Sequence, residues 1–221
     1  PFDFEITDFI TGQSLYDLSA KENITPYVQA LGTTLAQIHA TTTSGFGRLA
    51  GNRGAYSQWS DYFFTNLTPH LSFLLDANVV NPPTHKLITR IFTQHRHLIV
   101  CPSPRLLHGD VANHNAILSS NQIVLIDWED AISGDPLYDV AFYVTGVYLN
   151  RPWLKAFLAG YQQVAPAPVK FNLLFWLYFL RAALVKAIIR YRTTPSRGPL
   201  PDYAGRIAFA IDKIHTGVYT L

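Results

Sequence analysis

His108-Gly109-Asp110-Val111-Ala112-Asn113-His114-Asn115 is the stretch that decides the fold, together with Ile126-Asp127-Trp128 a few residues further on. Two short apolar runs, 116–118 and 123–126, lie between these pieces and flank the turn signal Ser119-Ser120-Asn121-Gln122. This pattern predicts a β-hairpin with its turn near Ser120-Asn121, which puts residue 115 roughly opposite residue 126. Asn115 and Asp127 should therefore lie side by side at the open end of the hairpin, with Asp110 in the loop just before it.

Two carboxylates and one amide oxygen would then converge in a small volume. Hard oxygen ligands suit Mg²⁺, which takes few protein ligands and keeps several water or phosphate oxygens. A carboxylate near the metal, but not on it, can accept the proton of an attacking hydroxyl. In the protein-kinase template an Asp precedes a metal-binding Asn by five residues, and a second metal-binding Asp follows the next strand. Asp110, Asn115 and Asp127 have that order and spacing, which indicates a phosphoryl-transfer site.

Three motifs in sequence carry a family resemblance. They are His108-Gly109-Asp110-x-x-x-x-Asn115, Ile126-Asp127-Trp128 and Gly134-Asp135-Pro136-x-Tyr138-Asp139-Val140-Ala141. Together they resemble the aminoglycoside phosphotransferase and choline-kinase-like family. More weakly, Phe9-Ile10-Thr11-Gly12 resembles the family's hinge between lobes, and Leu31-Gly32-x-x-Leu35-Ala36-x-Ile38-His39 resembles the first large helix of its C-terminal lobe. The resemblance implies a protein-kinase-like fold that transfers the γ-phosphate of ATP to a hydroxyl of a small molecule, such as an aminoglycoside-like sugar or an amino alcohol.

The resemblance also implies roles for individual residues. Asp110 would be the catalytic base, and Asn115 and Asp127 would be the Mg²⁺ ligands. His108, Asp135 and Asp139 match motif positions, and we expect them to support the catalytic loop structurally. The adenine of ATP would meet the backbone of the hinge, which we place at Thr7, Asp8, Phe9 and Ile10.

The fold class predicted from the whole chain is α+β and predominantly helical, with a central catalytic β-hairpin. Alternating apolar residues predict a strand over residues 1–10. Apolar residues at three- and four-residue spacing predict helices over 25–39, 59–75, 85–99, 153–161, 171–191 and 206–215, and another that begins at Pro136. Pro69 should kink or split the second of these helices. Residues 40–54 and 131–135 are predicted to be loops.

The family's N-terminal lobe carries a phosphate-covering loop and a strand lysine, both of which precede the hinge. Here the hinge motif lies at residues 9–12 and the first lysine is Lys21. We therefore expect residues 1–12 to be the last N-lobe strand and the hinge, and residues 13–221 to be a helical C-terminal lobe. The resemblance implies that this chain alone lacks half of the nucleotide clamp, so we expect little ATP turnover from it.

Composition excludes several classes of protein. Hydrophobic residues make up 48% and charged residues 14% of the chain, which is typical of a packed globular protein. The net charge of +2 is too small to favour nucleic acid or an anionic membrane as a partner. No stretch is long enough to span a membrane, because the most apolar run, 171–180, ends at Arg181. The single cysteine, Cys101, excludes an intrachain disulfide and favours a reducing, cytoplasmic setting.

Most of these residues also allow a purely structural role or a different functional role. Asp110 and Asn115 are also common in ordinary turns, and His108 and His114 are candidates for a zinc site with Asp110. Glu129 and Asp130 fit a second metal, a substrate amine or a solvated acidic loop equally well. The basic residues on the last long apolar helix favour snorkelling at the edge of the core over contact with an anionic substrate; they are Arg181, Lys186, Arg190 and Arg192.

Two further classes of function fit the same residues. A pseudokinase-like binding module would bind Mg-nucleotide without transferring phosphate. A metal-dependent hydrolase would use the carboxylates without ATP. The acceptor itself cannot be read from the sequence, because the C-terminal helices that set it in this family are mostly apolar here.

Overall fold

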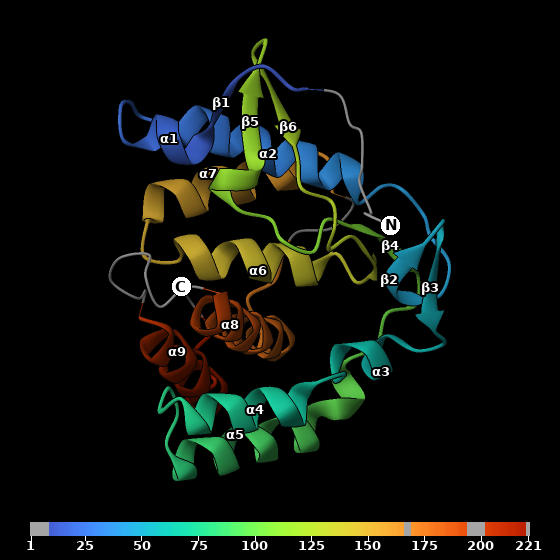
Figure 1. Ribbon diagram of the computed structural model, residues 1–221, viewed down its shortest axis with the longest axis vertical. Coiled ribbons are helices and arrows are strands. Elements are labelled where there is room, and N and C mark those ends of the chain that lie inside the picture. Colours follow the sequence, from blue (N-terminus) through green and yellow to red (C-terminus); the bar gives the residue numbers. More distant parts are fainter. Residues whose placement is uncertain (1–8, 166–168, 194–201, 220–221) are drawn as a thin grey trace, which may run out of the picture.

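The computed structural model describes residues 9–165, 169–193 and 202–219. Helices form most of the molecule, and of its two small sheets one lies at the top and the other at the right of the view in Figure 1. The helices are α1 Leu15–Ser19, α2 Thr25–Ile38, α3 Trp59–Phe63, α4 Leu67–Asp76, α5 Pro82–His95, α6 Leu137–Val147, α7 Arg151–Gln162, α8 Leu173–Thr193 and α9 Tyr203–Thr216, with short 3₁₀ turns η1 Arg96–Leu98 and η2 Asn113–Asn115. The strands are β1 Gln13–Ser14, β2 Phe46–Ala50, β3 Arg53–Tyr56, β4 Arg105–Leu107, β5 Ala116–Ser119, β6 Gln122–Leu125 and β7 Ile132–Gly134.

The predicted hairpin is confirmed as the antiparallel pair β5–β6, which β1 extends to a three-stranded sheet. Ala116 pairs with Leu125, so the register places residue 115 opposite residue 126, as expected. Ser120 and Asn121 form the two-residue turn with φ angles of 47° and 62°. Both angles lie in the left-handed region that tight hairpins require, which Ser tolerates less readily than Asn.

The second sheet has the order β3-β2-β7-β4 and contradicts two predictions. Residues 46–56 form the hairpin β2–β3 where a loop was predicted through Gly54, and residues 132–134 form β7 where a loop was predicted over 131–135. All of these strands are short, and β7 pairs with partners distant in sequence, β2 and β4, whereas β3 pairs with its sequence neighbour β2 in a hairpin whose register shifts between Phe46 and Leu49. Such strands depend on tertiary pairing and leave little periodicity in the sequence.

Close packing of α2 against α7 fixes the upper part of the molecule in Figure 1. Gly32 and Gly160 lie in this contact. A Cβ at Gly32 would meet the carbonyl oxygen of Phe157 at 2.1 Å, and a Cβ at Gly160 would meet that of Gln29 at 1.9 Å. The two backbones therefore approach each other more closely than any other residue type would allow.

Helix α8 is the centre of the hydrophobic core. Its residues 175–180 are fully buried, so the helix is covered on all sides, by α6, α9 and α4 among others. The helix predicted over residues 171–191 is thus confirmed, and it is a core helix. Within the described residues, no helix is both long and apolar enough to cross a lipid bilayer.

The helix predicted over 59–75 is split into α3 and α4, as one of the two outcomes foreseen for Pro69. The break falls before the proline, at Asn66, whose φ of 60° is left-handed. Pro69 itself lies in the first turn of α4, where a missing N–H costs nothing. Helix α5 starts earlier than predicted because Asn81 caps it, accepting the N–H of Thr84 at 2.9 Å.

Most of the predicted first strand, residues 1–8, lies outside the described residues. Phe9 and Ile10 are described and form no strand. Gly12 follows them and packs against β5, where a Cβ would meet the carbonyl oxygen of Leu118 at 2.3 Å. The chain therefore enters the described body directly alongside the hairpin.

Candidate active site

A buried carboxylate from α6 holds the loop that carries Asp110. Asp139 accepts the backbone N–H of His108 at 2.7 Å and that of Gly109 at 3.0 Å. Asp139 and His108 are both completely buried. Charged acceptors bind backbone N–H groups strongly, so this pair of bonds fixes the two residues that precede Asp110. The expectation that Asp139 and His108 support the loop agrees with these contacts.

His39, at the end of α2, completes the environment of Asp139. Its Nε2 lies 3.1 Å from Asp139 Oδ2, and its Nδ1 lies 2.8 Å from the hydroxyl of Tyr161. These contacts fit an imidazole that donates from Nε2 to the carboxylate and accepts from the tyrosine. Helices α2, α6 and α7 thus meet at one buried polar cluster beneath the loop.

The ring of His108 ties the loop to the end of β6. Its Nε2 lies 2.9 Å from the carbonyl oxygen of Ile126, and its Nδ1 accepts the backbone N–H of Asp110 at 3.3 Å. Both ring nitrogens are therefore occupied, which argues against the zinc site considered for His108, His114 and Asp110. Over the described ranges, no group of three or more His, Cys, Asp or Glu side chains could hold a metal ion.

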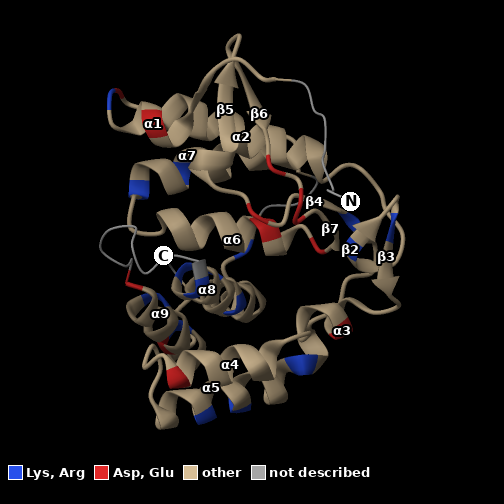
Figure 2. Ribbon diagram, viewed as in Figure 1, with Lys and Arg blue, Asp and Glu red and all other residues tan. Residues whose placement is uncertain are grey.

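Gly109 needs to be glycine for two reasons. Its φ of 87° is unfavourable for residues with a side chain, and a Cβ would lie 2.1 Å from the carbonyl oxygen of Asp130. The close contact joins the loop before Asp110 to the loop after Asp127. Figure 2 shows acidic residues gathered in these loops, between the hairpin and α6.

Asp110 and Asn115 are joined directly. The side-chain amide of Asn115 donates to the backbone oxygen of Asp110 at 3.0 Å and to its carboxylate Oδ2 at 3.1 Å. Asn115 is buried, whereas the His114 ring lies 3.9 Å from the same carboxylate and is exposed. The side-chain N–H groups of Asn115 thus hold Asp110, and the side-chain oxygen Oδ1 of Asn115 remains for another partner.

Asp127 lies beside Asn115 at the open end of the hairpin, as predicted. The N–H of Ile126 donates to the backbone carbonyl oxygen of Asn115 at 3.0 Å, and Asp127 follows in a left-handed conformation with φ 65°. Its carboxylate is exposed. The side-chain oxygen Oδ1 of Asn115 and the Asp127 carboxylate are hard ligands at one edge, a donor set that fits Mg²⁺, which takes one or two protein ligands and several waters or phosphate oxygens.

The predicted nucleotide-binding residues are only partly visible. Thr7 and Asp8 lie outside the described residues. Phe9 and Ile10 are 88% and 36% exposed, so neither packs into the described body to any large extent. Their role as a hinge that meets adenine remains a prediction.

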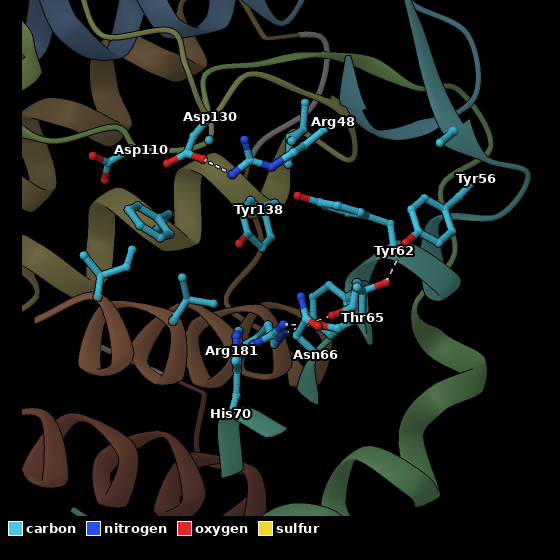
Figure 3. A pocket seen from close by; sticks show the side chains of 17 residues that line it. Arg48, Tyr56, Tyr62, Thr65, Asn66, His70, Asp110, Asp130, Tyr138 and Arg181 are labelled. Atoms are coloured by element: carbon cyan, nitrogen blue, oxygen red, sulfur yellow. Dashed lines mark hydrogen bonds and ion pairs between the residues drawn. The ribbon is translucent and has the colours of Figure 1, made fainter. Parts of the chain in front are cut away.

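A cavity of about 530 Å³ opens beside Asp110 (Figure 3). Asp110 and Asp130 lie on one side of it, and Arg181 and His70 lie on the opposite side, with tyrosine rings between them. Arg48 of β2 pairs with Asp130 at 2.5 Å. Other residues of its wall come from β3, α3, the α3–α4 turn and α6; they include Tyr56, Tyr62, Thr65, Asn66 and Tyr138.

The sequence did not identify this cavity, because its wall combines segments that are far apart in the chain. Arg48 was assigned to a loop, and Arg181 was expected to snorkel to solvent. Arg181 is instead only 5% exposed. Its position inside an otherwise fully apolar stretch of α8 was the one available signal, since a charge rarely lies in such a run without a partner.

A second group of buried, hydrogen-bonded side chains, formed by Asp135, Tyr178 and Trp59, supports the start of α6. Asp135 accepts the N–H of Leu137, the first residue of α6, at 2.9 Å, whereas Pro136 occupies the N-cap position of that helix. Tyr178 donates to the other oxygen of Asp135 at 2.8 Å, and Trp59 Nε1 donates to the Tyr178 hydroxyl at 2.7 Å. Burial raises the pKa of Asp135, and these donors oppose that shift.

The fold and the arrangement of Asp110, Asn115 and Asp127 are those expected from the sequence for a phosphotransferase with a protein-kinase-like fold. The chain belongs to the phosphotransferase enzyme family APH, which residues 1–172 match. It is also 27% identical over 151 residues to hygromycin-B 4-O-kinase of Escherichia coli. That match covers 66% of this chain and 42% of the relative, so the matched region spans less than half of the relative's length.

Solved structures share the fold at lower identity. A thermostable mutant of aminoglycoside phosphotransferase APH(4)-Ia in its apo form superimposes with a TM-score of 0.59 at 21% identity, covering 95% of this chain and 70% of that chain. The ternary complex of another mutant with AMP-PNP and hygromycin B gives 0.58 at 21% identity, over 95% and 69%. A choline/ethanolamine kinase family protein from Mesorhizobium loti gives 0.59 at 14% identity, over 96% and 66%.

Proposed function

We propose that this chain carries the catalytic half of an ATP- and Mg²⁺-dependent kinase that phosphorylates a hydroxyl of a small molecule. The observation that carries the proposal is the pair of hydrogen bonds by which Asn115 holds Asp110, next to Asp127 at the hairpin end. In kinases generally, a catalytic Asp and a metal-binding Asn at this spacing position the base and the metal ligand. Family membership supports the same reaction.

Asp110 is the proposed catalytic base. Its carboxylate lies at the cavity wall, where an acceptor hydroxyl could reach it, and the bond from Asn115 restrains one of its oxygens. A carboxylate so placed accepts the proton of the hydroxyl as that oxygen attacks the γ-phosphorus. The buried bonds from His108 and Gly109 to Asp139 keep the loop in place while this happens.

Asn115 and Asp127 are the proposed Mg²⁺ ligands. When bound, the metal would neutralise phosphate charge and orient the nucleotide. Asn115 contributes a carbonyl oxygen while its amide holds Asp110, so it would couple the position of the metal to that of the base. Asp127 contributes an exposed carboxylate from the opposite strand end.

The domain assignment is part of the same proposal. Residues 13–221 would form the C-terminal lobe, with the catalytic loop and the acceptor-binding helices. Residues 1–12 would form the last N-lobe strand and the hinge, with the backbone of Thr7, Asp8, Phe9 and Ile10 near the adenine. The pairing of β1 with β5 supports this division, because it places the end of the hinge segment against the catalytic hairpin.

The test is acceptor-dependent formation of ADP by the full-length protein with Mg²⁺. The names of the relatives include hygromycin B and choline/ethanolamine, so an aminoglycoside-like sugar and an amino alcohol belong in the panel beside neutral and acidic polyols. ADP formed in proportion to phosphorylated acceptor supports the proposal. Mg-nucleotide binding without turnover on any acceptor would indicate a pseudokinase-like module, and product release without ATP would indicate a hydrolase.

A further inference from the structure

We propose that the cavity beside Asp110 takes an anionic acceptor, a hydroxylated molecule whose carboxylate or phosphate group binds at Arg181. This inference rests on the proposed function, because it names the acceptor class of the same site. It departs from the cationic aminoglycosides and amino alcohols suggested by the relatives. The argument depends on how charge is distributed across the cavity.

Arg181 is a buried cation without an acidic partner among the residues that the structure describes. Its Nε donates to the carbonyl oxygen of Phe63 at 3.0 Å, and its Nη2 donates to that of Thr65 at 2.8 Å. Its Nη1 lies 3.1 Å from His70 Nδ1. A guanidinium has five N–H groups, so these bonds leave two, and neutral acceptors alone surround its charge.

One function of Arg181 is structural. Phe63 is the last residue of α3, and its carbonyl oxygen is one that a helix end leaves without an intrahelical partner. Arg181 therefore holds the turn between α3 and α4. A neutral donor could satisfy these carbonyl oxygens, however, and would avoid the cost of burying a full positive charge. An anionic ligand in the cavity would offset that cost.

His70 extends the donor surface around Arg181. Its Nδ1 accepts from Arg181, which leaves its Nε2 as a donor. Burial, aided by the charges of Arg181 and Arg192, lowers the pKa of His70 to about 4, so the ring is neutral near pH 7. No carboxylate lines this side of the cavity in the described part of the chain, and all lining groups near Arg181 are hydrogen-bond donors or uncharged.

The acidic side of the cavity offers little to a polycation. Its described lining holds two carboxylates, Asp110 and Asp130. Arg48 already pairs with Asp130 at 2.5 Å, and Asn115 holds Asp110. Figure 3 shows Asp110 and Arg181 on opposite sides of the space, so one molecule could present a hydroxyl to the first and an oxyanion to the second. Paired N–H donors of a guanidinium suit carboxylate and phosphate geometry.

The experiment uses sets of matched acceptors that differ at one carbon. A hexose set has glucuronic acid, glucose 6-phosphate, glucose and 6-amino-6-deoxyglucose, and a smaller set has glyceric acid, glycerol 3-phosphate, glycerol and 3-amino-1,2-propanediol. Binding to the full-length protein is measured by calorimetry with Mg²⁺ and a non-hydrolysable ATP analogue, and turnover is measured separately with ATP. We expect the acid or the phosphate ester to bind about tenfold or more tightly than its amine in at least one set. Whichever of the acid and the phosphate ester binds more tightly identifies the oxyanion that the site prefers.

Two variants connect this preference to the Arg181 side of the cavity. Arg181→Gln should abolish the preference, but it also loosens the α3–α4 turn. His70→Glu keeps Arg181 and gives it an internal carboxylate partner, so it should retain the fold and lose at least most of the tenfold preference for the acid. The matched control, His97→Glu on the exposed turn η1, should keep that preference.

The outcomes separate this inference from the proposed function. Tighter binding of the alcohol or amine in both sets, or no binding by any member, would overturn the anionic acceptor, and so would an unchanged preference in His70→Glu. Phosphorylation of amine-bearing acceptors would then still support the kinase. Selective binding of acids without any phosphoryl transfer would support the acceptor class and contradict the kinase.

Discussion

Asp139 accepts the backbone N–H of His108 at 2.7 Å across a sequence separation of 31 residues, within a completely buried environment. The next N–H, that of Gly109, donates to the other oxygen of the same carboxylate at 3.0 Å. This relationship between α6 and the loop before Asp110 accounts for the rigidity that the proposed chemistry requires. It also leads directly to the first prediction.

Asp139→Asn should destabilise the protein and lower its activity. The amide can accept one of the two backbone N–H groups, but its NH₂ would face the other, and the bond from His39 would lose its charged acceptor. We expect a loss of about 2–4 kcal/mol in the free energy of unfolding, measured by urea denaturation. Asp76→Asn, on the exposed end of α4, is the control and should change that free energy by less than about 0.5 kcal/mol. Equal stability of the two variants would contradict this assignment.

Gly109→Ala should cost more than the same change at another left-handed glycine. Gly109 has a φ of 87° and a Cβ there would meet the Asp130 carbonyl oxygen at 2.1 Å. Gly51 has a φ of 62° with nothing within 4 Å of the corresponding Cβ. Strain alone predicts a loss of about 1 kcal/mol in the free energy of unfolding for Gly51→Ala. The added clash predicts a loss of at least about 2 kcal/mol for Gly109→Ala. Thermal unfolding compares them, and similar melting temperatures would refute the packing argument.

Tyr178→Phe should destabilise the core without altering the acceptor cavity. The hydroxyl accepts from Trp59 Nε1 and donates to Asp135, so its removal leaves two buried polar groups without this partner. We expect the free energy of unfolding to fall by about 2–3 kcal/mol. A double-mutant cycle with Trp59→Phe measures the coupling between the two side chains. A coupling energy near zero would show that the hydrogen bond between them contributes nothing.

Parts of the fold that depend on local pattern were predictable. The β5–β6 hairpin follows from two apolar runs and a turn signal, and the register that brings Asn115 beside Asp127 follows from the hairpin. The helices α2, α6 and α8 follow from periodicity and proline positions. The strand β7 was missed because pairing with partners distant in sequence makes it a strand, and the local β2–β3 hairpin was missed because its strands are short and its register shifts between Phe46 and Leu49.

The residues of the site likewise divide into those that local motifs predict and those that only the fold brings together. Asp110, Asn115 and Asp127 belong to motifs with fixed spacing, so the sequence identified them together. The cavity depends on α3 and α4 approaching α8, an approach that Arg181 stabilises through the carbonyl oxygens of Phe63 and Thr65. No spacing rule connects residues more than a hundred positions apart. Arg181 could therefore be noticed in the sequence but not placed.

His70 should make the protein sensitive to acid. Its pKa in the folded state is about 4, against an ordinary value of 6.5, chiefly because burial disfavours the charged ring. As the pH falls below 6.5 the unfolded chain takes up the proton first, so stability decreases down to about pH 4 and this contribution is then constant. His70→Asn keeps an acceptor for Arg181 and should reduce the loss between pH 7 and pH 5 by about 1 kcal/mol, allowing for the partial exposure of the ring. Urea denaturation at both pH values measures this, and an identical pH dependence in the variant would contradict the shifted pKa.

The most direct measurement concerns Asp110 as the base. Asp110→Asn keeps an oxygen that can accept from the Asn115 amide, so the loop should retain its structure while the side chain can no longer accept a proton. In the full-length protein with saturating Mg-ATP and acceptor, we predict a fall in kcat of about 10²–10⁴-fold with unchanged nucleotide affinity, and we predict wild-type kcat for Asp76→Asn. A kcat for Asp110→Asn within about threefold of wild type would contradict the account, because proton acceptance by this carboxylate should contribute far more than that.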